Sequence, residues 1–351
     1  MAYTTIDDPS AYFQTKLYAG TGSELVITND GNSDLQPDFI WIKNRTDGST
    51  NHHAVNTSIG STRNLFVNKT DYEEGQAQSV KSIQSDGFTL GTWDGDNVNA
   101  KNFVAWQWKA NGGTTTAFSE SGNNPGGTCQ ANTTAGFSIV TYTGTGAAGT
   151  VTHGLGVAPK LIIIKNRDAT DPWAVLPPDR SDLYLVLNTT VGWAASSAFW
   201  NDTAPSSTVF TVNTDHSVNA DAEAYVAYCF TETQGYSKFG TYYGNANADG
   251  EFVYLGFKPA FVMVKVLSDP NYGWVIADNK RGPFNENDPS VYANSDAAET
   301  TNDFNGDFLS NGFKLHGTTY PANSGGTNTF AYFAWAENPF VTSTGIPATA
   351  R

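Results

Sequence analysis

The sequence has few basic residues and few cysteines, and it has no long apolar run. Only 19 of its 351 residues are Lys or Arg, against 34 Asp and Glu, so the formal net charge is −15. A surface that binds nucleic acid needs clustered basic residues to contact the phosphates. This composition does not supply such a cluster, and we expect no nucleic-acid partner.

The missing apolar runs and cysteines exclude two further classes of protein. No segment approaches the roughly 18 apolar residues that a membrane-spanning helix needs, and the segment from Met1 to Asp8 lacks the basic and apolar regions of a signal peptide. Two cysteines, Cys129 and Cys229, are too few for a disulfide scaffold. We therefore expect a protein that is made in a cytoplasm and does not insert into a membrane. We also expect both thiols to be unpaired.

The residues that are abundant favour β structure. Aromatic residues make up 13% of the chain and there are 34 glycines, while charged residues reach only 15%, against roughly 25% in an ordinary soluble domain. Thr, Val, Tyr and Phe favour strands, and Gly, Asn and Ser favour turns. The composition therefore predicts a β protein with polar turns.

An internal repeat is the most informative feature of the chain. Three segments have a Pro followed six residues later by a Lys that closes an apolar run: Pro37 to Lys43, Pro159 to Lys165 and Pro259 to Lys265. A Tyr-x-Gly precedes each Pro, beginning at Tyr18, Tyr142 and Tyr242. Each unit closes on an aromatic strand around a small residue, which we align at Ala105, Ala227 and Ala334.

The repeat sets the expected domain boundaries. We place repeat 1 at residues 12–110, repeat 2 at 136–236 and repeat 3 at 237–340, with an N-terminal arm at 1–11 and a C-terminal tail at 341–351. The segment 111–135 is rich in Gly, Thr and Asn, a composition that predicts a flexible linker. Repeats 2 and 3 have no such linker between them, so we expect those two to pack as a rigid pair.

Local patterns predict an all-β fold. The Pro-to-Lys runs are apolar at consecutive positions, so each is expected to be a central strand with Phe39 and Trp41 on one face and Ile40 and Ile42 on the other. Asp86-Gly87 and Asn311-Gly312 suit tight hairpin turns, which the middle repeat lacks. The prediction is three tandem antiparallel β-sandwich domains of a jelly-roll-like kind.

No pattern in the sequence indicates catalysis. The nucleophile elbow, the zinc-protease motif, the phosphate-binding loop and Cys-x-x-Cys are all absent. His52 and His53 would point to opposite faces of a strand, so we interpret them as part of a polar loop and not as a metal pair. We expect no catalytic residue and no bound cofactor, although paired carboxylates that cleave sugars need no sequence spacing and remain an alternative.

Two weaker binding patterns deserve mention. Asp94 and Asp96 could offer oxygen ligands to Ca²⁺, but the closing Glu of a calcium loop is missing, which favours a solvated turn. Trp193 and Trp200 lie in looser sequence than the other tryptophans and are our candidates for stacking on a sugar ring.

The repeated lysines Lys43, Lys165 and Lys265 could be interpreted as a functional ring. A Lys at the end of a buried strand can instead lay its stem over the sheet and keep its charge in water. We prefer this second interpretation.

Six blocks of the sequence resemble one known family: residues 2–15, 35–45, 153–160, 225–230, 235–240 and 337–345. They are similar to repeat-containing virion proteins of tailed bacteriophages, notably those of marine and cyanobacterial hosts. The resemblance covers nearly the whole chain and brings no catalytic motif with it. It implies a structural role, either tail-fibre-like or on the capsid surface.

These observations lead to one expectation of function. We expect a non-enzymatic, tail-fibre-like structural protein that is made in the host cytoplasm and displayed on the virion. There it is expected to mediate attachment of the virion to the host surface. Its expected partners are other virion proteins, a host-surface glycan or receptor, and further copies in a homo-oligomer. A capsid-decorating or spacer protein, and a carbohydrate-binding or depolymerase module, are the alternatives.

Overall fold

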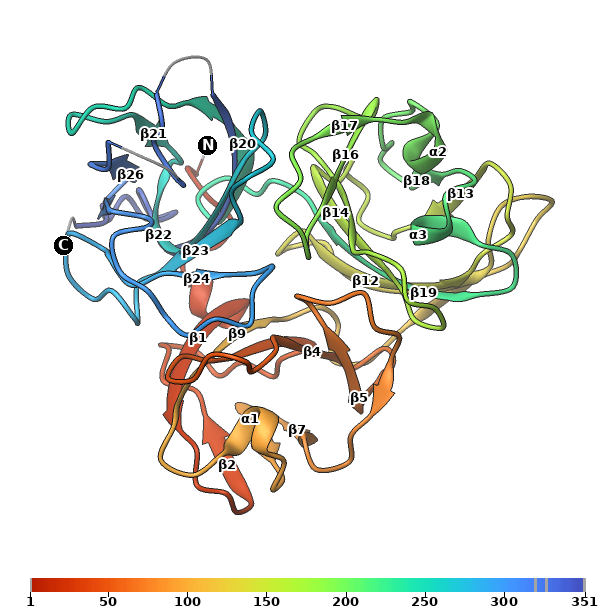
Figure 1. The fold of residues 1–351 in the computed structure, drawn as a ribbon, viewed down its shortest axis with the longest axis horizontal. Coiled ribbons are helices and arrows are strands. Elements are labelled where there is room, and N and C mark those ends of the chain that lie inside the picture. The colour runs from red at the N-terminus through yellow and green to blue at the C-terminus, as the bar shows by residue number, and fades with distance from the viewer. Residues whose placement is uncertain (1, 319–320, 326–327, 350–351) are drawn as a thin grey trace.

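A computed structural model describes residues 2–318, 321–325 and 328–349 of the chain. The described chain is all-β, with antiparallel strands in several sheets and only single turns of helix. Each repeat contributes one larger and one smaller sheet, and the repeats lie around a common centre (Figure 1).

Repeat 1 forms a six-stranded sheet and a three-stranded sheet. The larger sheet has the order β1 (Phe13–Ala19), β9 (Asn102–Trp108), β3 (Phe39–Asn44), β4 (His53–Asn56), β5 (Gly60–Phe66) and β6 (Glu74–Gly75). The smaller sheet has the order β2 (Leu25–Thr28), β8 (Gly87–Leu90) and β7 (Val80–Gln84). Two short helical turns accompany them, η1 (Pro9–Ala11) and α1 (Asp94–Asn97).

Repeat 2, together with the segment before it, forms an eight-stranded sheet and a two-stranded sheet. The larger sheet has the order β10 (Thr116–Phe118), β11 (Gly127–Asn132), β12 (Phe137–Thr143), β19 (Ala224–Phe230), β14 (Leu161–Asn166), β15 (Ala174–Leu176), β16 (Leu183–Val186) and β17 (Ala194–Ala195). The smaller sheet pairs β13 (Gly149–Thr152) with β18 (Val209–Val212). The helical turns are α2 (Ser197–Trp200) and α3 (His216–Asn219).

Repeat 3 forms a five-stranded sheet and a three-stranded sheet. The larger sheet has the order β20 (Ser237–Tyr243), β27 (Thr329–Pro339), β22 (Phe257–Val266), β23 (Trp274–Asp278) and β24 (Val291–Tyr292). The smaller sheet has the order β21 (Phe252–Tyr254), β26 (Gly312–Leu315) and β25 (Gly306–Leu309).

The three larger sheets share one strand order over five strands, β1-β9-β3-β4-β5 in repeat 1, β12-β19-β14-β15-β16 in repeat 2 and β20-β27-β22-β23-β24 in repeat 3. Their registers also correspond, because the repeated lysines pair with Val104, Val226 and Ala331. The residue that matches Ala105 in repeat 3 is therefore Tyr332, and our sequence alignment at Ala334 was wrong by two residues. The larger side chain fits because the facing residue, Gly240, has no Cβ. A Cβ at that position would lie only 2.8 Å from the Tyr332 hydroxyl.

Strands β3, β14 and β22, which hold the apolar runs that the repeated lysines close, bury both of their faces, as the sequence predicted. In β3, Phe39 and Trp41 enter a core that draws residues from all three repeats, whereas Ile40 and Ile42 pack toward the smaller sheet of repeat 1. This alternation follows from the two-residue period of a strand. The shared core is what holds the repeats around one centre.

The predicted flexible linker is wrong, because β10 and β11 lie within residues 111–135. Strand β11 pairs with β12 along its whole length, from Gly127 opposite Tyr142 to Asn132 opposite Phe137. The backbone N–H groups of Gly112 and Gly113 donate to the Asp38 carboxylate at 2.9 and 3.0 Å. The polar residues of this segment take part in strand pairing and in hydrogen bonds to the rest of the protein. Composition alone does not distinguish such an ordered segment from a flexible linker.

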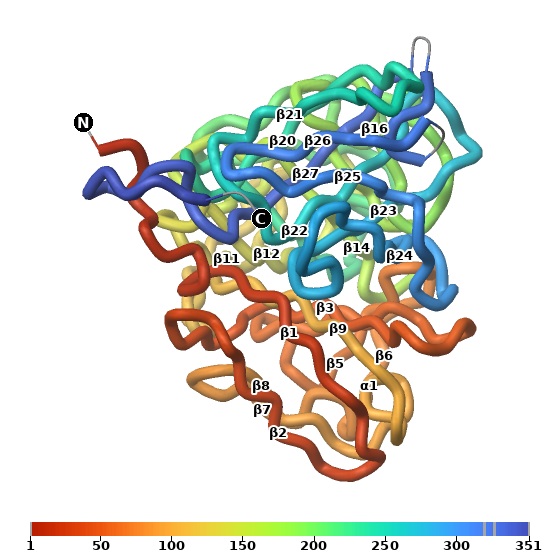
Figure 2. The backbone as a smooth tube through the Cα atoms, turned by 90° about the vertical axis from the view of Figure 1, so that its left-hand side faces the viewer, coloured from red at the N-terminus to blue at the C-terminus, as the bar shows by residue number. Residues whose placement is uncertain are grey.

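The ends of the described chain also pack against it. Ile6 is buried in the shared core, and the backbone N–H of Ser343 donates to the Asp7 carboxylate at 2.6 Å. Figure 2 shows these first and last segments side by side. Both cysteines are unpaired, as expected, and both are buried. Among the described residues, no helix is long and apolar enough to cross a membrane.

Candidate functional site

A surface depression on repeat 3 has the composition of a ligand site. Its volume is about 390 Å³, and it lies where the edge strands β20 and β21 face each other. Three aromatic side chains are exposed there, Tyr243 at 69%, Phe252 at 40% and Tyr254 at 49%. We call this depression the repeat 3 groove; Thr241, Tyr242, Glu251, Val253 and Tyr332 complete its lining.

Strand geometry explains why these rings face solvent. Along β21 only the middle residue, Val253, is buried, so Phe252 and Tyr254 point outward on either side of it. The Lys238 ammonium donates to the Tyr254 carbonyl at 2.8 Å and lies 5.3 Å from the centre of the Tyr254 ring. The Tyr254 ring is therefore held in place beside a fixed cation.

The other two repeats carry no aromatic residue at the corresponding positions. Val253 pairs with Phe313 as Ile27 pairs with Phe88 and Val151 with Phe210. The outward residues beside Ile27 are Val26 and Thr28, those beside Val151 are Thr150 and Thr152, and the residues that match Tyr243 are Ala19 and Thr143. The aromatic set therefore belongs to repeat 3 alone, although one fold serves all three.

The two predicted stacking tryptophans do not take part in this groove. Trp200 is only 1% exposed and packs in the core of repeat 2, so the prediction was wrong for this residue. Trp193 is half-buried between repeats 2 and 3, where its backbone N–H donates to the Leu267 carbonyl at 3.1 Å. The Arg180 guanidinium lies 5.2 Å from the centre of its ring.

The predicted calcium candidates lie in different environments. Asp96 is fully buried, and its two carboxylate oxygens bond to His53 and Ser79, whereas Asp94 is exposed. The residues that the structure describes include no group of three His, Cys, Asp or Glu side chains placed to hold a metal ion. His53 lies on β4 and is buried, so our interpretation of the histidines as part of a polar loop was wrong.

The repeated lysines do not keep their charges in water. Lys43, Lys165 and Lys265 are all fully buried, and burial lowers the pKa of each from its usual 10.5 to about 8. Their ammonium groups donate to backbone carbonyls, for example from Lys265 to Tyr272 at 2.6 Å. They are structural donors inside the protein, which our interpretation from the sequence missed.

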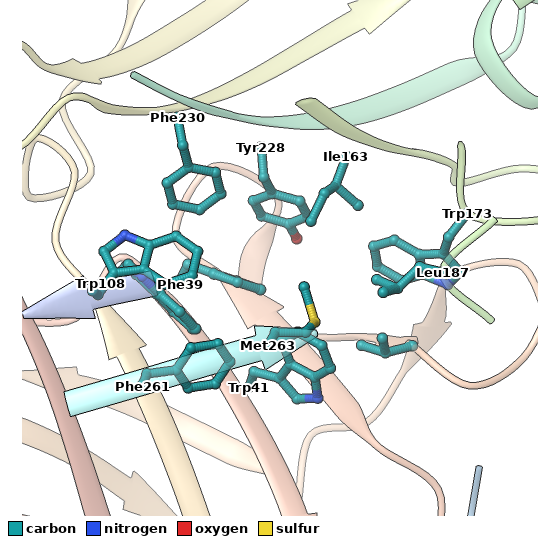
Figure 3. Close-up of a pocket in the computed structure, with 12 residues that line it drawn as sticks. Phe39, Trp41, Trp108, Ile163, Trp173, Leu187, Tyr228, Phe230, Phe261 and Met263 are labelled. Atoms are coloured by element: carbon teal, nitrogen blue, oxygen red, sulfur yellow. The ribbon is translucent and has the colours of Figure 1, made fainter. Parts of the chain in front are cut away.

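Where the repeats meet, the shared core encloses a small cavity (Figure 3). Its volume is about 20 Å³, and aromatic and aliphatic side chains from all three repeats surround it, among them Trp41, Ile163 and Met263. A space of this size holds at most one water molecule, and an apolar lining offers that water no partner. The cavity is thus a packing feature and not a ligand site.

Comparison with known proteins identifies a family model that matches most of the chain. The model of a protein family described as a domain of unknown function (DUF7483) matches residues 8–339, which include repeats 1 and 2 and all but the last residue of repeat 3. No curated protein matches the chain. A solved structure described as "Crystal Structure of the STIV MCP" aligns with a TM-score of 0.15 and 9% identity, over 65% of this chain and 93% of that one.

Proposed function

The chain belongs to the DUF7483 family, described as a domain of unknown function, and we propose that it is a non-enzymatic structural protein of a bacteriophage particle that attaches to the host surface. The observation that carries this proposal is the repeat 3 groove, a depression whose lining includes three residues with exposed aromatic side chains. In this proposal the protein is tail-fibre-like, lies on the virion with other virion proteins, and forms a homo-oligomer.

The chemistry of the groove favours a glycan as the surface ligand. Aromatic faces provide apolar contact area with a polar end, and sugars present apolar C–H faces between their hydroxyl groups. Glu251 and Thr241 line the same depression and can bond those hydroxyls. A carbohydrate-binding function of this kind needs no catalytic residue.

We also propose that each repeat is one jelly-roll-like β-sandwich. The shared strand order of the larger sheets supports this, as does the apolar cluster that lies between the two sheets of repeat 1 and its counterpart in repeat 2. A rigid body of three such units would present the groove at a fixed distance from the particle. The sequence blocks that resemble phage virion proteins support the location on the virion.

The repeats themselves supply the test of the groove. Changing Tyr243→Thr, Phe252→Thr and Tyr254→Thr together installs the residues that repeat 2 carries at these positions. We expect the triple variant to bind immobilised host-envelope polysaccharide at least tenfold more weakly than the unchanged protein, measured by biolayer interferometry. The matched control is Phe284→Thr, since Phe284 is 78% exposed and does not line the groove.

Equal binding by the triple variant and the unchanged protein would remove the groove from the proposal. Release of new reducing ends from the polysaccharide would instead identify a depolymerase and overturn the non-enzymatic assignment. Antibody labelling of intact particles in the electron microscope distinguishes a tail-fibre position from a capsid-decorating or spacer position. Label confined to the capsid would contradict the tail-fibre-like role.

A further inference from the structure

A second pocket, on repeat 1, lies above a buried chain of polar side chains. The pocket has a volume of about 400 Å³, and His53, Trp93 and Asp94 are among its lining residues. The His53 ring lies 4.4 Å from the Trp93 ring, centre to centre, and it is only 2% exposed. Beneath it, Nδ1 of His53 bonds to Asp96, which in turn accepts a hydrogen bond from Ser79.

The other repeats show that the fold does not need this polar chain. His53 faces Ile42 on β3, and the matching residues, which face Ile164 and Val264, are Ala174 and Val275. The residues that correspond to Asp96 are Val218 in repeat 2 and Ala322 in repeat 3. In each repeat the carbonyl of this residue accepts a hydrogen bond from the hydroxyl of the repeated tyrosine, which is Tyr18, Tyr142 or Tyr242. Where repeat 1 buries a His and an Asp, repeats 2 and 3 therefore bury apolar residues.

A buried carboxylate and imidazole are expensive to desolvate, and apolar residues at such positions are often as stable or more so. Residues that break a local packing rule without a structural need tend to mark functional positions. Gly95 adds to this: a Cβ there would lie 2.7 Å from both the His53 and the Trp93 rings. The glycine therefore lets the backbone pack directly against both rings at the floor of the pocket.

The pocket is rich in hydrogen-bond acceptors, while Ser49, Thr50, Asn51 and Lys69 supply side-chain donors. Nδ1 of His53 faces a carboxylate oxygen of Asp96, and a carboxylate oxygen accepts hydrogen bonds, so in a neutral ring the proton lies on Nδ1 and Nε2 keeps a lone pair. The wall carries the carboxylates of Asp71, Glu74 and Asp94 and a single cation, Lys69, which lies 3.6 Å from Asp71. Acceptors and negative charge together favour a ligand that is positively charged and rich in donors.

From this arrangement we propose that the repeat 1 pocket binds an alkylammonium group. The ammonium donates to Nε2 of His53 and to the carboxylates of the wall, while Trp93 offers its ring to the cation and to the alkyl chain. This assignment does not rest on the repeat 3 groove or on its glycan. It gives the protein a second site, for a ligand of different chemistry.

Two of the buried lysines hold two walls of the pocket in place. One wall includes Thr50, whose carbonyl accepts from Lys43 at 2.9 Å. Another is the loop from Lys69 to Glu74, which Lys165 of repeat 2 fixes through the Thr70 carbonyl at 3.0 Å. A preorganised pocket of this kind loses less entropy when it binds a ligand.

The test uses three probes of nearly equal shape: butylammonium chloride, butanol and sodium butyrate. The readout is the Trp93 indole N–H signal in protein labelled with ¹⁵N-tryptophan, which Trp93→Phe identifies by its loss. We expect butylammonium to shift this signal saturably and the other two probes to leave it in place. An equal response to butanol or butyrate, or no response to butylammonium, would overturn the proposal even if no variant were made.

A double variant, His53→Ala with Asp96→Val, installs the residues of repeat 2 and should keep the fold. We expect it to weaken butylammonium binding at least tenfold, whereas the matched surface change Glu120→Gln should leave binding unchanged. Binding that persists in the folded double variant would contradict a role for His53. Nα-acetyl-lysine methylamide then separates the sources: tighter binding than butylammonium indicates the lysine side chain of a partner, and weaker binding a free amine.

Discussion

The ammonium group of Lys165 in repeat 2 donates a hydrogen bond to the carbonyl oxygen of Thr70 in repeat 1, over a distance of 3.0 Å. Lys43 of repeat 1 reaches Asp296 of repeat 3 in the same way, at 3.1 Å. Lys265 of repeat 3 reaches Thr190 of repeat 2, at 2.8 Å. Each repeat therefore donates to a different neighbour, and the three contacts close a ring within one chain. This is the geometry of a head-to-tail cyclic trimer.

A second set of contacts follows the same ring. The carbonyl of Arg45 accepts from the N–H of Glu299, that of Arg167 from Glu73, and that of Leu267 from Trp193. The side chains of Arg45 and Glu299, and those of Arg167 and Glu73, also form ion pairs. At the third interface the corresponding side chains are the half-buried indole of Trp193 and the buried Leu267. The three interfaces thus share their backbone geometry but differ in chemistry.

Removing one ring contact should cost stability. Lys165→Met deletes a donor that serves the carbonyls of Thr70, Asn166 and Ala169. A buried carbonyl without a partner costs about 1–3 kcal/mol, and we expect a loss in that range or above it in urea unfolding. Lys160→Met is the control, because Lys160 pairs with Asp179 at the surface. A loss no larger than that of the control would show that the ring contacts contribute little.

The buried lysines also predict an unusual pH dependence. Burial lowers the pKa of Lys43, Lys165 and Lys265 to about 8, while an unfolded lysine keeps its proton until about 10.4. Between these values the unfolded state binds more protons, so stability rises with pH. The pKa of buried tyrosines such as Tyr142 is raised well above 10, so stability should fall again once unfolded tyrosines ionise.

Burial also raises the pKa of Cys129 and Cys229, which opposes the rise once unfolded cysteines ionise near about pH 8.5. We therefore expect the melting temperature to rise from pH 8 to about pH 9 and to decline above pH 10. Differential scanning calorimetry over this range measures the effect. Lys43→Met and Lys265→Met should each flatten the rise. A melting temperature that falls steadily from pH 8 would contradict a depressed pKa for these groups.

Glu299 should matter more to stability than its counterpart Glu73. Glu299 accepts hydrogen bonds from Nε and Nη2 of Arg45, each at 2.8 Å, and also contacts Arg281, whose side chain is fully buried. Glu299→Gln removes a negative charge that offsets the buried charge of the Arg281 guanidinium. We expect the free energy of unfolding to fall by about 1–3 kcal/mol. Glu73→Gln removes charge from partners that are more exposed, Arg167 and Arg63, and we expect a smaller loss. Equal losses in urea unfolding would argue against the importance of Arg281.

The sequence predicts local structure better than it predicts how the repeats meet. Strand parity placed Phe39 and Ile40 on opposite faces, and the Asp86-Gly87 and Asn311-Gly312 pairs marked the β7-β8 and β25-β26 hairpins, because these features depend on neighbouring residues. The local sequence around a lysine at the end of a strand is the same whether its ammonium contacts water or a distant carbonyl. The carbonyl that Lys165 contacts lies 95 residues away in the sequence.

The residues of the repeat 3 groove were hard to predict for a related reason. Tyr243, Phe252 and Tyr254 lie in ordinary strand sequence, and only the repeat could have revealed them, by comparison with Thr143, Thr150 and Thr152. That comparison needs the correct register, and in β27 an aromatic residue precedes an alanine at Phe330, Phe333 and Trp335. The local pattern alone does not choose between them.

The shared core predicts that one repeat will not fold by itself. In repeat 2, Phe137, Ile139 and Tyr228 point into the core that all three repeats build, and the fragment 111–236 would expose them to water. Burial of such side chains stabilises the folded state by roughly 1.5–3 kcal/mol each. We expect this fragment to aggregate or to lack native near-ultraviolet circular dichroism, and the full chain to unfold in urea in one transition. A soluble, monomeric fragment with a cooperative transition of its own would instead show that the repeats are independent domains.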